Sequence, residues 1–229
     1  MHQQPDTPYT LPNLEELRLG WYGYAADYHH ARVQFSKLPN LRRLDLSGIA
    51  FTNEDRQYPP NLEYLRFHAG GANWNFISPN PGPLLPRLKS LVFSDINWVC
   101  DLSLLWYLDN TSSAALDTLW LDSCLNIGSC LREIAERGYF SHLTELSVSR
   151  IPVVDDALVQ VLLAYMSRVK VLHLSYTGIT GRAVKMLADA RVSGEDKAGK
   201  VERVFLRGCE DVSFDAVVYG RARGVEIFT

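Results

Sequence analysis

Apolar residues recur along the chain in one short frame, whose first, fourth and sixth positions are apolar and most often Leu. Subtracting successive first positions gives steps of 27, 21, 26, 28, 27, 26, 32 and 21 residues. These steps centre on the period of about 20 to 29 residues that is typical of solenoids with one short strand per repeat. The nine frames are Leu14/Leu17/Leu19, Leu41/Leu44/Leu46, Leu62/Leu65/Phe67, Leu88/Leu91/Phe93, Leu116/Leu119/Leu121, Leu143/Leu146/Val148, Val169/Leu172/Leu174, Val201/Val204/Leu206 and the degenerate Ala222/Val225/Ile227.

The frame predicts a short β-strand in every repeat. Successive side chains of a strand point to opposite sides, so we expect the first, fourth and sixth positions to face the core and the third and fifth to face outward. Between strands, apolar residues at helical spacing predict helices over 157–165 and 183–188. We therefore expect residues 1–229 to form one α/β domain, a curved solenoid of about nine repeats with a parallel sheet on its concave side and helices or irregular loops on its convex side.

Boundary residues agree with this periodicity. Asp101 and Ser213 precede apolar runs and can cap helix N-termini, while Gly138 suits a helix stop. Four Pro residues, each two positions before a frame, favour an extended entry into the strand. The Gly- and Pro-rich stretch 68–87 and the polar stretch 192–200 interrupt the rhythm. We expect both to be solvated loops, with contact to a partner as the alternative.

Composition excludes several classes of protein. Hydrophobic content of 47% and charged content of 21% are ordinary for a folded protein. The net charge of -3 gives no basic field, so nucleic acid is not an expected partner. We find no apolar run of membrane-spanning length and no signal-peptide pattern at the start, and therefore expect an intracellular protein, cytoplasmic or nuclear, with no membrane association. The four Cys residues lack metal-site spacing and are expected to be reduced structural thiols.

Two clusters of polar residues invite a chemical role. His29 and His30 lie near Asp27, but adjacent His side chains do not necessarily converge on one ion. Asp155 and Asp156 form a carboxylate pair at a predicted helix start, where negative charge is favourable to the helix dipole. No nucleophile, base and orienting group share a recognisable arrangement, so we expect no enzymatic activity, metal or cofactor.

The later repeats resemble the cysteine-containing leucine-rich repeat. The stretch 206–213 (LRGCEDVS), followed by Ala216 and Val217, is similar to the pattern L-x-x-C-x-x-[IV]-[ST]-D-x-[GA]-[LV]. The stretch 174–180 fits with Thr177 at the Cys position, and 153–158 (VVDDAL) fits the second half. The chain departs from the pattern at two positions that should be Asp, Gly181 and Phe214. The general leucine-rich repeat covers nearly the whole chain, and this subtype covers it from about Val153 onward.

The resemblance implies a function. In families that carry it, this repeat commonly forms the substrate-recognition arm of F-box proteins, which dock through an N-terminal F-box onto a Skp-type adaptor of a cullin ubiquitin ligase. The segment before Leu14 is too short for an F-box, so this adaptor contact requires an upstream segment. We therefore expect either a fragment of a longer protein or a solenoid whose ends are closed by partner surfaces. The alternative function is a scaffold or inhibitor, without ubiquitin chemistry, that binds a protein through the same face.

The outward columns of the frame supply the candidate binding residues. Large aromatic residues on an exposed strand face are unfavourable unless covered, and aromatic and Arg side chains are frequent binding anchors. The alternatives are that neighbouring side chains or a C-terminal tail cover the aromatic residues, and that the Arg residues pair only with Glu226. Arg203 and Arg207, beside Phe205, are further candidates for recognising an acidic or phosphorylated segment. The expected contact residues are Tyr64, Arg66, Trp120, His173, Arg203, Phe205 and Arg207.

Overall fold

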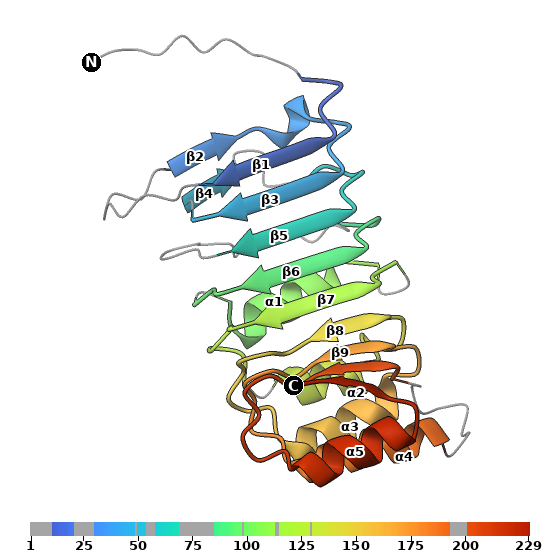
Figure 1. Cartoon of the computed structure of the whole chain (residues 1–229). Helices are drawn as coiled ribbons and strands as arrows, with labels where there is room; N and C mark the ends of the chain where they lie inside the picture. The colour runs from blue at the N-terminus through green and yellow to red at the C-terminus, as the bar shows by residue number, and fades with distance from the viewer. Residues whose placement is uncertain are drawn as a thin grey trace.

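The computed structural model describes residues 11–20, 30–48, 50–53, 58–68, 85–97, 99–112, 115–128, 130–192 and 201–229. Within these residues, nine strands form one parallel sheet in which each strand pairs with the strand of the next frame (Figure 1). The predicted parallel sheet is thus confirmed. Its strands are β1 (Glu16–Gly20), β3 (Arg43–Ser47), β5 (Tyr64–His68), β6 (Ser90–Ser94), β7 (Thr118–Asp122), β8 (Glu145–Ser147), β9 (Val171–His173), β10 (Arg203–Phe205) and β11 (Glu226–Phe228).

The register places each strand at the third position of its frame, except in the last repeat. There, Arg203 pairs with Glu226 and Phe205 with Phe228. The third and fifth positions of this repeat are therefore Glu226 and Phe228, and the frame assigned to Ala222/Val225/Ile227 begins two residues too early. The error is an even number of residues, so Val225 and Ile227 still face the core, at 3% and 4% exposure.

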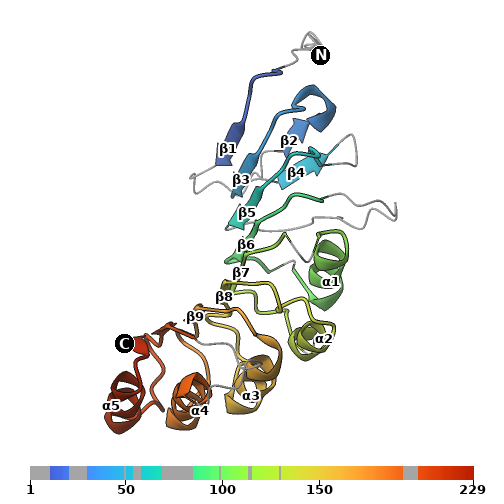
Figure 2. The same cartoon turned by 90° about the vertical axis from the view of Figure 1, so that its right-hand side faces the viewer.

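Five helices of the described chain cover one face of the sheet, and Figure 2 shows them following one another along one side of the strands from β6 onward. In the N-terminal part the same side carries a 3-10 turn, Phe35–Lys37, and a separate parallel pair, β2 (His30–Val33) with β4 (Ala50–Asn53), which the frame did not predict. We call the other face of the nine-stranded sheet the open face. The helices are α1 (Asp101–Asp109), α2 (Cys130–Glu136), α3 (Asp156–Tyr165), α4 (Gly181–Val192) and α5 (Phe214–Ala222).

Helix boundaries follow local chemistry. Ser213 caps α5 by accepting a hydrogen bond from the Ala216 N–H, as predicted. Gly138 ends the turn after α2 in the left-handed conformation, with φ of 80°. The prediction for Asp101 was wrong: Cys100 is the N-cap of α1, and the Asp101 carboxylate instead accepts the Gly128 N–H of the next repeat at 2.8 Å.

The core lies between the sheet and the helices. The first, fourth and sixth residues of the frames from Leu41 onward are buried except Ala222, which is exposed at the end of α5. A hydrogen-bonded pair, Tyr58 and Tyr107, lies among the buried residues with oxygens 3.0 Å apart. Burial raises the pKa of both phenols, so both stay protonated and the hydrogen bond needs no charge. Phe67 and Phe93 stack beside this pair, with ring centroids 5.5 Å apart.

Three of the four Cys residues are buried, and Cys209 contacts a backbone carbonyl group. Cys124, Cys130 and Cys209 are buried, and all four cysteines of the chain are free thiols. Cys209 Sγ lies 3.1 Å from the Leu174 carbonyl, to which the Thr177 hydroxyl also donates. Thr177 therefore occupies the Cys position, as its alignment with the repeat pattern indicated, because a small hydrogen-bond donor is what this buried turn requires.

A left-handed residue follows most strands at the same place in the repeat. A single positive-φ residue lets the chain turn sharply from the sheet toward the opposite layer, and Gly adopts this conformation most easily. At Gly208 the requirement is also steric, because a Cβ built there would lie 2.3 Å from the Tyr176 ring. The positive-φ residues of this column are Gly48, Asp95, Ser123, Arg150, Tyr176 and Gly208.

No helix in the described part of the chain is long and apolar enough to cross a membrane. The loop predicted over 68–87 falls largely on residues 69–84, and that over 192–200 on residues 193–200, all outside the described residues. Asp27 and His29 of the candidate metal cluster lie outside them as well.

Candidate functional site

The open face carries the third and fifth columns of the frame and divides into two halves. Strands β7 to β11 present a row of aromatic rings, while β1 to β5 present mainly charged side chains. The parallel, in-register pairing creates this division, because it places equivalent positions of successive repeats side by side.

An aromatic ladder formed by Trp120, His173, Phe205 and Phe228 crosses the C-terminal half. His173 stacks on Phe205 with ring centroids 4.3 Å apart and planes 4° from parallel. Phe205 stacks on Phe228 at 4.6 Å and 11°. These separations match the strand spacing of about 4.8 Å, because the three residues are register partners on adjacent strands. The ladder is thus a direct product of the sheet register.

Trp120 joins the ladder across an intervening strand. Between β7 and β9 lies β8, whose residue in this column is Ser147, only 1% exposed. The Trp120 ring leans past this small side chain to lie 5.3 Å from the His173 ring. Glu145 of β8 holds both rings, with Oε1 3.0 Å from Trp120 Nε1 and 3.3 Å from His173 Nε2. The ladder therefore has an internal acceptor that fixes its two polar members.

Stacking within the ladder covers the faces of its inner rings and leaves part of the ring surface accessible to solvent. His173 and Phe228 cover the two faces of the Phe205 ring. For these ring faces, neighbouring side chains therefore provide the cover, which was the alternative to a binding partner. Phe228 at the end of the ladder remains 45% exposed. Ring edges carry partial positive charge, and each stacked pair contributes about 0.5 to 1.5 kcal/mol beyond its buried area. The arrangement is pre-organised and presents a rigid apolar ridge.

The charged half is largely paired within itself. Arg18 Nε lies 2.6 Å from Glu16 Oε1, and Arg66 Nη1 lies 3.5 Å from Asp45 Oδ2. The Arg43 guanidinium lies over the Tyr64 ring, 4.3 Å from its centroid. Most of the charge on this half therefore has a partner.

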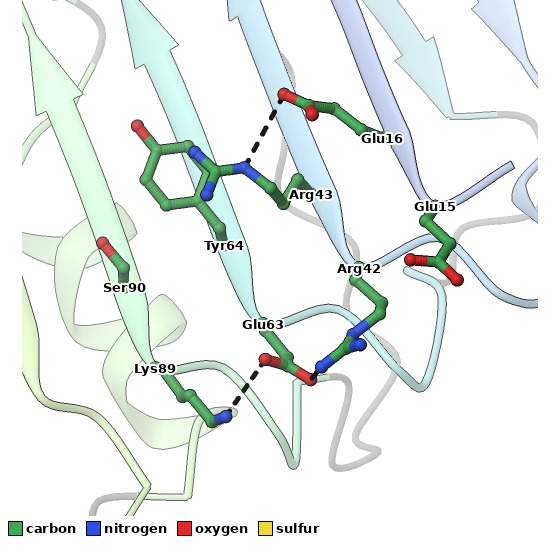
Figure 3. Close-up of a pocket in the computed structure, with 8 residues that line it drawn as sticks. All are labelled: Glu15, Glu16, Arg42, Arg43, Glu63, Tyr64, Lys89 and Ser90. Atoms are coloured by element: carbon green, nitrogen blue, oxygen red, sulfur yellow. Dashed lines mark hydrogen bonds and ion pairs between the residues drawn. The ribbon is translucent and has the colours of Figure 1, made fainter.

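A shallow hollow of about 380 Å³ lies at the edge of the charged half where the strands begin (Figure 3). Glu63 lies at the centre of its ion pairs. It accepts hydrogen bonds from Arg42, the residue before β3, and from Lys89 at 3.0 Å. These two cations lower the Glu63 pKa. Alternating charges in adjacent repeats thus neutralise one another, and the hollow has no excess charge to attract an ion. It is lined by Glu15, Glu16, Arg42, Arg43, Glu63, Tyr64, Lys89 and Ser90.

The structure separates the sequence-predicted residues into two groups. Trp120, His173 and Phe205 come together in the ladder, whereas Tyr64 and Arg66 belong to the charged half. Arg203 and Arg207 are exposed, two residues before and two residues after Phe205.

Two residues of the ladder site were missed. Phe228 was overlooked because the last frame was placed two residues early, and a register continued from β10 would have found it. Glu145 was in an outward column, but its two contacts depend on side chains from β7 and β9.

The open face carries a serine and a histidine on adjacent strands, β8 and β9. Ser147 and His173 are neighbours on the open face, but Ser147 Oγ donates to Asp122, and no hydrogen bond between Ser147 and His173 occurs among the described residues. Burial raises the pKa of Asp122. In the described part of the chain, no group of three or more His, Cys, Asp or Glu residues could hold a metal ion.

The Asp155–Asp156 pair is occupied by backbone contacts. Asp155 caps α3 by accepting the Leu158 N–H at 2.8 Å. Asp156 accepts both the N–H and the hydroxyl of Thr180, at 2.8 and 2.6 Å. Both carboxylates thus have structural partners at a helix start, which is the role that the repeat pattern indicated.

Comparison with known proteins finds similarity among solved structures only. No protein-family model and no curated protein matches the chain. Among solved structures, a chain of the crystal structure of the Rad7 and Elc1 complex in yeast is similar, with a TM-score of 0.62 and 14% sequence identity. The likeness is one of fold. It covers 83% of this chain and 48% of that chain, so this chain spans about half the length of its structural neighbour.

Proposed function

We propose that this chain is a non-enzymatic, intracellular protein-binding module, a leucine-rich repeat solenoid of about nine repeats that recognises its partner with the concave open face. Its most specific form is the substrate-recognition domain of an F-box-type cullin ubiquitin ligase receptor. The observation that carries the binding role is the aromatic ladder from Trp120 to Phe228, held rigid by Glu145 and partly accessible.

Two further findings support the proposal. The similar fold belongs to a chain in a crystal structure of two proteins in complex, Rad7 and Elc1. The sequence pattern around Cys209 resembles the repeats of F-box substrate receptors, and the buried Cys209 and the partly buried Thr177 occupy equivalent places in two successive repeats. Protein binding rests on the geometry of the open face, whereas the ligase role rests on the resemblance.

The binding role is tested by replacing Trp120 and Phe205 together with Ala. Each is an aromatic anchor of the kind whose truncation removes about 2 kcal/mol or more from a binding free energy. We expect the double variant to lose at least a hundredfold in affinity for partners captured by the wild-type chain, because every 1.4 kcal/mol is about a factor of ten. The measurement is affinity purification with quantitative mass spectrometry, followed by titration of the captured partner.

A matched control is available on the helical side. Leu102 and Phe214 are 77% and 76% exposed, so a Leu102→Ala/Phe214→Ala variant removes two exposed apolar side chains away from the open face. We expect this control to keep partner binding, and circular dichroism to show unchanged folding for both variants. Equal binding by the wild type and the Trp120→Ala/Phe205→Ala variant would refute recognition through the ladder.

The rival function is a scaffold or inhibitor without ubiquitin chemistry. Purification of the complete native protein from cells separates the two. A Skp-type adaptor and a cullin among the stoichiometric partners support the ligase role, and their absence alongside a stable stoichiometric partner supports the scaffold. Either result is compatible with binding through the ladder, so this experiment tests only the ligase assignment.

A further inference from the structure

Arginine side chains on the open face differ in their pairing between the two halves. In the charged half, Arg18 and Arg43 both lie within ion-pair distance of Glu16, at 2.6 and 3.7 Å, and Arg66 contacts Asp45. These guanidinium groups therefore already have an anionic partner within the sheet. An anionic ligand that bound these guanidinium groups would have to displace the Glu or Asp carboxylate already paired with them.

Arg203 and Arg207 beside the ladder lack such partners. Both are exposed, and neither forms an ion pair with another residue in the described part of the chain. Glu226 is the register partner of Arg203, but no ion pair joins them, so the sequence-based alternative of internal pairing is not realised. The adjacent acid Glu202 is taken by Lys170, at 3.5 Å. Among the described residues, two exposed guanidinium groups thus flank Phe205 without a hydrogen bond or ion pair to another side chain.

The dimensions of this region suit a short extended segment. Arg203 begins β10 and Arg207 stands in the turn two residues after its last residue, Phe205, so at most about 13 Å of chain separates them at 3.3 Å per residue. The ladder crosses from β7 to β11, which is four strand spacings or about 19 Å. An extended segment of about six residues spans this distance and can place acidic groups near both guanidinium groups while an apolar residue contacts the ladder.

We propose that the ladder half of the open face binds an acidic segment of a partner protein, with Arg203 and Arg207 receiving its carboxylate or phosphate groups. A guanidinium offers two parallel N–H donors to such groups, and the positive edges of the aromatic rings favour the same sign of charge. This inference rests on the proposed function and names the chemistry of the partner at that site.

Binding of defined peptide pools to the complete chain tests the inference. Four fluorescein-labelled hexapeptide pools share one central Leu or Phe and carry only Asp and Glu, only phosphoserine, only Asn and Gln, or only Lys and Arg at the other positions. The informative variant is Arg203→Glu/Arg207→Glu. Its control, Arg132→Glu/Arg182→Glu, makes the same charge change at exposed residues of α2 and α4, which lie on the helical side.

We expect the acidic pool, the phosphoserine pool or both to bind at least tenfold more tightly than the neutral pool, and the difference between these two pools identifies the source of the anion. The Arg203→Glu/Arg207→Glu variant should lose at least tenfold, whereas the control variant should change by less than about threefold through long-range charge alone. Equal binding of neutral and acidic pools, equal losses in the two variants, or no binding of any pool would overturn the inference. Loss of the native partner in Trp120→Ala/Phe205→Ala, but not in Arg203→Glu/Arg207→Glu, would leave the proposed function standing and remove only the acidic partner.

Discussion

Replacing Asp156 tests how successive repeats are joined. Its carboxylate stands in the first turn of α3 and accepts two hydrogen bonds from Thr180, which precedes α4. Asp101 makes the equivalent contact from α1 to Gly128, at 2.8 Å. We therefore predict that Asp156→Ala loosens the junction between the repeats that contain α3 and α4, because a solenoid is stabilised mainly by contacts between neighbouring repeats.

The magnitude follows from the two contacts. A hydrogen bond to a charged group contributes about 1.5 to 3 kcal/mol, and the partly buried position of Thr180 favours the lower value. Loss of a negative charge near a helix N-terminus adds about 0.5 kcal/mol. Asp156→Ala should therefore lower the free energy of unfolding by about 3.5 kcal/mol. Asp156→Asn can keep both contacts through its amide and should lose only about 1 kcal/mol.

Asp215 provides the control, because it occupies the first turn of α5 without a side-chain contact elsewhere in the described chain. Asp215→Ala removes only the favourable interaction with the helix dipole, about 0.5 kcal/mol. The assay is urea unfolding followed by circular dichroism, with amide hydrogen exchange to locate the loss at α3 and α4. A loss for Asp156→Ala no larger than that for Asp215→Ala would refute the assignment of Asp156 as a link between repeats.

Two further predictions concern a steric and an electrostatic constraint. Gly208→Ala should lower the free energy of unfolding by about 2 to 3 kcal/mol, because residue 208 has a left-handed φ of 70° and its new Cβ would contact the Tyr176 ring. In a Tyr176→Ala background the loss measured by urea unfolding should fall to about 1 to 2 kcal/mol. A loss that stays the same in this background would exclude the steric contribution. Asp122 has its folded-state pKa raised by burial above the ordinary 3.8, so its ionisation destabilises the fold above the folded-state pKa and has no effect below 3.8. Asp122→Asn should therefore be more stable than the wild type in urea at about pH 7 and equally stable near pH 3, and a pH-independent difference would contradict this cause.

The periodicity of the sequence was sufficient to predict the nine-stranded parallel sheet, but not the separate pair of β2 and β4. A frame whose fourth and sixth positions are apolar fixes which side chains of a strand face the core, because this alternation has a period of two and depends only on local geometry. Leu44, Leu65 and Leu119 are accordingly buried at 0% exposure. The same local logic predicted the Ser213 cap and the Gly138 turn. At Asp101 it failed, because a capping residue one position earlier, Cys100, freed the carboxylate to reach the next repeat.

Only the tertiary structure decided which outward residues act together. Sequence placed Trp120 and His173 in one column but not within contact of each other, because they lie two strands apart and meet only where the small Ser147 separates them. Glu145 became part of the site because both rings converge on one of its oxygens.

The last repeat shows the same limit. Its degenerate apolar pattern allowed two frames, and the hydrogen bond from the Glu226 N–H to the Glu202 carbonyl, at 2.8 Å, determines which one is formed. That choice places Phe228 on Phe205. Local alternation therefore determined which side of the sheet each residue faces. Inter-strand register and side-chain reach, which join residues distant in the sequence, determined the aromatic ladder. They also left Arg203 and Arg207 beside it without an ion pair among the residues that the structure describes.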